Sequence, residues 1–189
     1  LFIATVFSTL LVGAMWAEES PLNNPPAGVP FTAILIGILR AGAPFSASLM
    51  GILLAHELGH YLVARYYGVA ATLPYFIPMP IPVNPLGTFG AFISMKEPVT
   101  NRRALLAIGA AGPLAGFVVT LPILILGLLL SKVEPLPTVL PPDRQIVMEG
   151  NSLLYLGLKY LIFGRILPSG GDDVLLHSVA FAGWAGLLV

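Results

Sequence analysis

Apolar and polar stretches alternate along this chain with the lengths of membrane-associated helices. Residues 1–17 are apolar and predict the end of a membrane helix, and residues 18–30 are polar and proline-rich, which predicts a loop. Residues 31–39 are apolar but too short to span a bilayer, so we expect an interfacial or re-entrant segment there. After a break at residues 42–44, an apolar helix is expected over residues 45–67, because the proline that ends the break suits a first helical turn.

The rest of the chain divides into one extended stretch and three further apolar segments. Prolines recur through residues 73–98 and exclude a helix there. Residues 87–95 alternate as in a strand, so the stretch predicts an extended hairpin whose free edge can pair with another backbone. A surface loop is the alternative. The apolar segments predict helices at residues 104–131, 152–167 and 174–189.

Composition extends this picture to the class of protein. The chain is 57% hydrophobic and 10% charged, whereas soluble domains carry roughly 25% charged residues. We therefore predict an all-α polytopic membrane protein, a transmembrane helix bundle with a short re-entrant or membrane-associated β-hairpin, in one membrane-embedded domain over residues 1–189. The lipid bilayer is then a partner. Basic and acidic residues balance at nine each, which does not indicate a nucleic-acid partner.

Candidate metal chemistry lies inside the apolar helix expected at residues 45–67. The stretch His56-Glu57-Leu58-Gly59-His60 has two histidines four residues apart, so both imidazoles point the same way and can hold one zinc ion (Zn²⁺). Glu57 is offset around the helix and can act as general base without being a ligand. The chain has no cysteine, so any zinc must be held by histidine and carboxylate. In the alternative, both histidines are core residues and Glu57 pairs with Arg65.

Four stretches of the chain are informative together: HELGHYLVARYYGV (56–69), PYFIP with LGTFGAFI (74–93), AGPLAGF (111–117) and HSVAFAGWAGLLV (177–189). They resemble the site-2 protease family of intramembrane zinc metalloproteases, in the branch of plastids, cyanobacteria and archaea. The resemblance implies that His56 and His60 bind zinc and that Glu57 activates water. It also implies cleavage of membrane-protein substrates in or near their transmembrane segments, by an integral, multi-pass protein of a prokaryotic cell membrane or a plastid membrane.

The resemblance also assigns parts of the chain to substrate binding. Residues 87–95 would lie near the substrate, with Gly87, Phe89, Gly90 and Phe92 as the contact residues. Many family members have Asn where this chain has Gly116, so no oxyanion role is expected there. Small residues around Gly116 predict close packing against another helix instead.

The resemblance places the third zinc ligand in a Leu-Asp-Gly motif, which this chain does not contain. The order of motifs puts it shortly after Val189, so the chain is expected to be a C-terminally truncated piece of a longer protein. Asp172, Asp173 and His177 are possible substitutes within the chain, the two aspartates being better explained as turn residues. Two further functions stay open: an inactive protease-like protein that binds helices, and an ion-coupled transporter.

Overall fold

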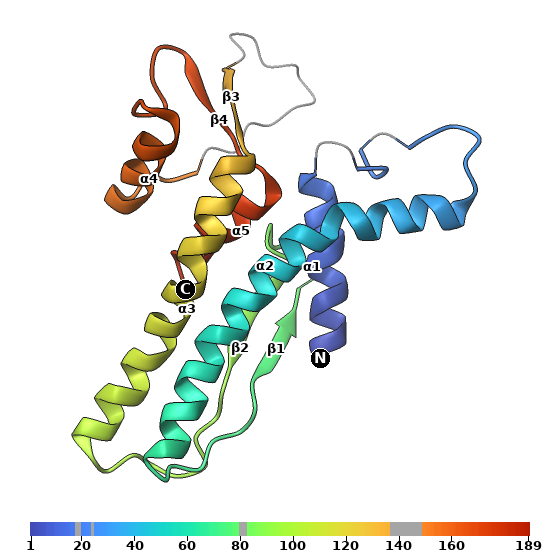
Figure 1. Ribbon diagram of the computed structural model, residues 1–189. Coiled ribbons are helices and arrows are strands. Elements are labelled where there is room, and N and C mark those ends of the chain that lie inside the picture. Colours follow the sequence, from blue (N-terminus) through green and yellow to red (C-terminus); the bar gives the residue numbers. More distant parts are fainter. Residues whose placement is uncertain (18–19, 24, 80–82, 137–148) are drawn as a thin grey trace.

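The computed structural model describes residues 1–17, 20–23, 25–79, 83–136 and 149–189. This part of the chain is mostly helical and includes two small antiparallel sheets (Figure 1). In chain order the elements are α1 (Phe2–Trp16), α2 (Phe31–Tyr66), β1 (Tyr75–Pro78), β2 (Thr88–Phe92), α3 (Arg102–Leu130), β3 (Lys132–Pro135), α4 (Leu153–Phe163), β4 (Asp172–Leu175) and α5 (Ser178–Gly186).

Helix α2 is longer than the sequence predicts. The separate segment expected at residues 31–39 and the helix start at residue 45 are both wrong, because one helix continues through Pro44. A proline removes one hydrogen bond of the helix and bends it without ending it when packing supports both sides. Figure 1 shows this bend where α2 crosses α1. Gly42 allows the crossing, since a Cβ there would overlap the backbone of Leu10.

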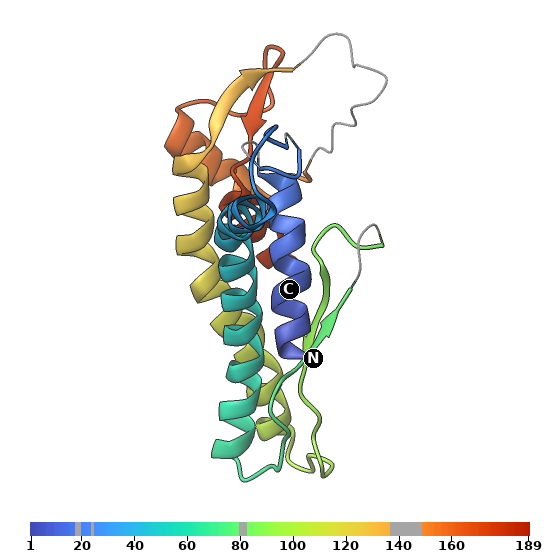
Figure 2. The ribbon, with the colours of Figure 1, turned by 90° about the vertical axis from the view of Figure 1, so that its right-hand side faces the viewer.

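Helices α2 and α3 form an antiparallel pair, and α5 runs back along the upper half of α3 (Figures 1 and 2). Both contacts are close because glycine faces backbone. A Cβ on Gly59 of α2 would lie 2.5 Å from the carbonyl oxygen of Ala111, and one on Gly183 of α5 would lie 2.7 Å from Cα of Leu124. The predicted role of small residues in helix packing is therefore confirmed.

The hairpin β1–β2 lies beside α1 and α2 (Figures 1 and 2). Tyr75 pairs with Phe92 in antiparallel register, so a strand within the predicted residues 87–95 is confirmed. The hydroxyl of Ser8 on α1 donates a hydrogen bond of 2.7 Å to the carbonyl oxygen of Gly87. The Trp16 indole nitrogen donates one of 3.0 Å to the carbonyl oxygen of Pro85. Side chains of α1 thus hold the turn end of the hairpin.

The second sheet is not predicted by the sequence. Strand β3 lies between the helices expected at residues 104–131 and 152–167, and residues 137–148 of that stretch are outside the described residues. Strand β4 occupies the start of the helix expected at 174–189, so α5 begins only at Ser178. Pairing of Val133 with Val174 satisfies backbone groups that a helix would otherwise satisfy. Helix α4 also ends earlier than predicted, at Phe163, and is capped by Gly164, whose φ is +71°.

A buried charge cluster, which we call the Lys159 cluster, joins α4 to this second sheet. The Lys159 ammonium is completely buried, 3.3 Å from a carboxylate oxygen of Glu149 and 3.7 Å from one of Asp173. It also lies 4.6 Å from the ring centroid of Tyr155. The Tyr155 hydroxyl donates a 2.9 Å hydrogen bond to Glu149. Burial, followed by the charge of Glu149, raises the pKa of this phenol above its ordinary value.

Two of the described helices, α2 and α3, are long and apolar enough to cross a membrane. Only 28% of the most apolar window of each is buried inside the protein. Most residues of each window are therefore partly or fully exposed, as is usual for helices in contact with lipid.

Candidate metal centre

The candidate metal ligands lie on α2, two turns before its end. His56 and His60 are four residues apart, and their Nε2 atoms approach to 3.1 Å. Two nitrogens at this separation can each lie about 2.0–2.1 Å from one zinc ion, since twice that bond length exceeds their separation. The backbone of α2 thus brings together the pair that the sequence predicts.

A carbonyl of α3 fixes the tautomer of His60. Its Nδ1 lies 2.6 Å from the carbonyl oxygen of Ile108. A carbonyl can only accept, so Nδ1 carries the proton and Nε2 keeps its lone pair for a metal. The Nδ1 of His56 is buried and has no hydrogen-bond partner among the described residues. The sequence does not reveal the role of Ile108, because only the packing of α3 on α2 places this carbonyl.

Two glycines of α3 make room for the imidazoles. A Cβ on Gly112 would overlap the ring of His60, and one on Gly116 would lie 3.3 Å from Nδ1 of His56. Gly112 and Gly116 are one turn apart on the face of α3 that meets α2. The AGPLAGF stretch therefore shapes the back wall of the histidine pair.

Glu57 faces the hairpin rather than α3. Its side chain is 6% exposed, and its carboxylate accepts a hydrogen bond from the backbone of Ile93. Within the described residues it forms no ion pair with Arg65, which is exposed. The alternative in which these two residues pair is therefore not observed. A buried carboxylate one residue from His56 is instead held by the strand segment.

The segment beside Glu57 presents a backbone edge. The amide of Lys96 donates to Ala70 and the amide of Thr72 to the carbonyl of Ser94, so Ser94 and Lys96 bond toward the neighbouring strand. Alternation along a strand then points the backbone groups of Ile93 and Met95 to the opposite edge. On this edge, the backbone of Ile93 donates the hydrogen bond to the Glu57 carboxylate.

The predicted substrate-contact residues divide into two groups. Gly87 is buried against α1, where a Cβ would lie 2.8 Å from the carbonyl oxygen of Ser8. Phe89 is 63% exposed and Phe92 48% exposed. Gly90 has open space around it, and its φ of +100° is a backbone conformation that favours glycine. Phe89, Gly90 and Phe92 remain available at the surface, whereas Gly87 attaches the hairpin to α1.

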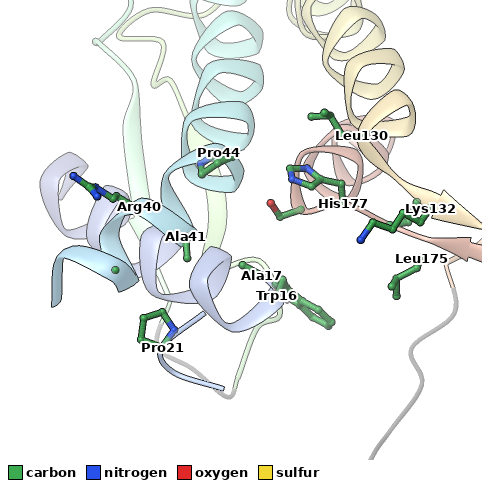
Figure 3. A pocket seen from close by; sticks show the side chains of 13 residues that line it. Trp16, Ala17, Pro21, Arg40, Ala41, Pro44, Leu130, Lys132, Leu175 and His177 are labelled. Carbon is green, nitrogen blue, oxygen red and sulfur yellow. The ribbon is translucent and has the colours of Figure 1, made fainter. Parts of the chain in front are cut away.

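The possible substitute ligands lie elsewhere. Asp172 pairs with Arg165 at 2.9 Å, and Asp173 belongs to the Lys159 cluster. His177 caps α5 and lines a pocket of about 520 Å³, across from Ala41 and Pro44 of α2 (Figure 3). Neither candidate ligand of α2 lines this pocket. Among the described residues no group of three His, Asp or Glu side chains could hold a metal.

Comparisons with known proteins identify the family to which the chain belongs. The model of peptidase family M50 matches residues 44–183, which include both histidines, the hairpin and most of α5. The chain belongs to peptidase family M50. The resemblance to site-2 proteases is thereby confirmed, and the matched residues of this M50 chain include the whole stretch from His56 to His60.

Relatives of this M50 chain include proteins named as plastid enzymes. "Probable zinc metalloprotease EGY2, chloroplastic" of Oryza sativa subsp. japonica is 37% identical over 134 residues, 71% of this chain and 23% of that protein. "Probable zinc metalloprotease EGY1, chloroplastic" of Arabidopsis thaliana is 30% identical over 199 residues, 99% of this chain and 34% of that protein. The chain thus spans a quarter to a third of the length of these relatives. No solved structure matches it.

Proposed function

We propose that this chain is the metal-binding part of an intramembrane zinc metalloprotease that hydrolyses peptide bonds in or near transmembrane segments of membrane proteins. The observation that carries the proposal is the convergence of His56, His60 and a buried Glu57 on one apolar helix. Ionisable groups inside such a helix are costly without a function.

The proposed setting is an integral, multi-pass membrane protein of a plastid or prokaryotic cell membrane. Helices α2 and α3 are the proposed spans, with α1 and a longer form of α5 completing the bundle. The length of α2 and α3 and their largely unburied apolar residues support this, because lipid accommodates apolar surface that water does not. The names of the relatives, which describe them as chloroplastic, support a plastid location.

We place the third ligand, an aspartate, on a continuation of α5 beyond Val189. Helices α3 and α5 are antiparallel and in steady register: Gly127 meets Ala180, Leu124 meets Gly183, and Thr120 meets Gly186. Moving forward along α5 therefore moves back along α3 toward Gly116, the level of His56. A helix that continued on the same axis would reach the histidines within about one or two turns.

Each residue then has a chemical task. Zinc, when bound, lowers the pKa of a coordinated water to about 7 and polarises a carbonyl. Glu57 accepts the proton of the attacking water and passes it to the amide nitrogen that leaves. The backbone of Ile93 keeps the Glu57 carboxylate in place for this transfer. Ile108 holds His60 in the ligand tautomer.

The substrate is proposed to lie along the free edge of the hairpin. An unfolded transmembrane segment exposes backbone groups that a strand edge can pair with, and pairing keeps the scissile bond extended. The edge formed by Ile93 and Met95 is adjacent to Glu57. Exposed Phe89 and Phe92 would contact the side chains of the substrate.

Glu57→Gln in the full-length protein tests the proposal. The probe is a set of single-span peptides with a fluorophore and a quencher, in detergent micelles. We expect a fall in cleavage of about 10²–10⁴-fold with unchanged zinc content. Glu97→Gln, an exposed carboxylate outside the site, should cleave normally. Undiminished cleavage by Glu57→Gln would refute the assignment, and zinc binding without cleavage by the wild type would favour a helix-binding protein.

A further inference from the structure

Four cations gather at the end of the molecule where α2 ends and α3 begins. Arg65 belongs to the last turn of α2, Arg102 and Arg103 open α3, and Lys96 follows the hairpin. The amide of Lys96 donates to Ala70, which ties its segment to the chain leaving α2. Figure 1 shows both helix ends together at the bottom of the molecule. We call these four residues the basic end.

The cations of the basic end have no acidic partners among the described residues. All four side chains are exposed, and none forms an ion pair in the part of the chain that the structure describes. The described residues include eight basic and six acidic side chains, and of these four basic residues and only Glu97 lie here, which leaves four basic and five acidic residues elsewhere in that part of the chain. The chain is neutral as a whole, yet one end is strongly positive.

Aromatic side chains lie at the basic end itself, and apolar side chains continue inward from it. Tyr66 is 84% exposed and its ring lies 5.3 Å from that of Tyr67. One turn further in, Leu62 is 61% exposed on α2, and Leu106 is 74% exposed on α3. Moving inward along both helices, the surface therefore changes from cations, with Tyr66 and Tyr67 beside them on α2, to exposed apolar side chains. Headgroups, interface and acyl chains of a bilayer present the complementary order.

We propose that the basic end docks onto a leaflet rich in anionic lipids, with lipid phosphates bound by Arg65, Lys96, Arg102 and Arg103. This inference rests on the proposed spanning placement of α2 and α3. A basic residue near an anionic surface strengthens binding by about fivefold, so four give several hundredfold at low salt. Salt weakens the effect because these charges are exposed.

Docking also fixes the depth of the histidine pair. Arg65 is five residues beyond His60, which is about 7.5 Å along a helix axis. With the arginine at the headgroups, the two histidines lie just beneath the same leaflet. Water and substrate segments would therefore reach the site from the anionic side of the membrane.

The experiment measures lipid preference of the full-length protein in mixed micelles. The probe is acyl-labelled phosphatidylglycerol, competed with unlabelled phosphatidylglycerol or phosphatidylcholine and read as the amount of label that co-elutes with the protein. We expect wild type to prefer phosphatidylglycerol over phosphatidylcholine. In the variant with all four residues of the basic end replaced by Gln, the ratio of the two affinities should fall at least about 100-fold. Two single variants form a matched pair. Arg103→Gln should lower this affinity ratio about fivefold, whereas Arg40→Gln, which removes an exposed cation at the other end of the protein, should leave it unchanged.

Zinc content and peptide cleavage, measured on the same samples, separate this inference from the proposed function. An unchanged lipid preference in the quadruple variant, or an equal loss in Arg40→Gln, would overturn the docking surface while leaving the protease intact. Failure of the wild type to stay in the membrane fraction after alkaline extraction would overturn both.

Discussion

Gly112 is the position where adding a single methyl group would disturb the geometry of the metal centre most. It lies on α3 against the imidazole of His60, and Cε1 of that ring would be 2.5 Å from an added Cβ. Carbon atoms in ordinary contact are about 3.5–4.0 Å apart. Gly112→Ala must therefore move the ring, or the two helices, by about 1 Å or more.

This shift is large on the scale of metal coordination, where ligand distances are held to about 0.2 Å. His60 would also lose its hydrogen bond to Ile108, which by itself costs about 10–100-fold in metal affinity. We expect zinc affinity to fall by at least about 100-fold in Gly112→Ala. Overpacking should lower the free energy of unfolding by about 1–3 kcal/mol.

Two neighbouring glycines of α3 supply graded controls. A Cβ on Gly116 would lie 3.3 Å from His56, so Gly116→Ala needs only a small adjustment and should cost zinc affinity about tenfold or less. Nothing lies within 4 Å of a Cβ on Gly109. Gly109→Ala should bind zinc normally and gain about 0.5–1 kcal/mol of stability from its lower backbone entropy when unfolded.

The assay is competition for zinc with a chromogenic chelator, using full-length protein in detergent. Thermal unfolding in zinc-free buffer measures the packing cost separately. Wild-type zinc affinity in Gly112→Ala would refute the reasoning, because the imidazole cannot share that space with a methyl group. Equal losses in Gly112→Ala and Gly109→Ala would show that helix propensity, rather than contact with His60, is responsible.

Two further predictions concern the Lys159 cluster and are read by thermal unfolding. Lys159→Met should destabilise the protein by about 3–5 kcal/mol, because it leaves buried carboxylates without a cation. Arg165→Met, which breaks an exposed pair, should cost about 1 kcal/mol or less. Equal costs for the two variants would contradict a stabilising role of the buried Lys159 cluster. Tyr155 keeps its proton in the folded state above pH 10, where the unfolded chain loses it, so stability should fall as pH rises beyond about 10. Tyr155→Phe should remove that part of the decline, and an unchanged pH profile would argue against a raised pKa.

The sequence predicts the histidine pair well because its geometry is local. Four residues of helix place His56 and His60 on one face whatever surrounds them, and the structure finds their Nε2 atoms 3.1 Å apart. The partner of each ring is not local. Ile108 contacts His60 only because α3 packs closely on α2, and a single sequence does not specify which turn of one helix meets which turn of another.

The errors along the chain have the same origin. Pro44 is a good helix start by local preference, yet α1 packs against Gly42 and the helix continues through both. Strand β4 begins in a segment that looks like the start of an apolar helix, and its pairing with β3 joins residues about forty apart in sequence. In each case tertiary contact overrides a weak local preference.

Helix α3 contributes no candidate metal ligand, yet it sets the distances between those that are proposed. It touches the histidines through Gly112 and α5 through Gly127, where a Cβ would overlap Ala180. The helix therefore acts as a spacer between α2, which carries the histidine pair, and α5, on whose continuation the third ligand is proposed. A larger side chain at Gly127, about three turns from Gly116, would displace α5 and with it any carboxylate that α5 carries. Judging whether a related chain retains its metal chemistry thus requires inspecting the glycines of the spacer as well as the ligands.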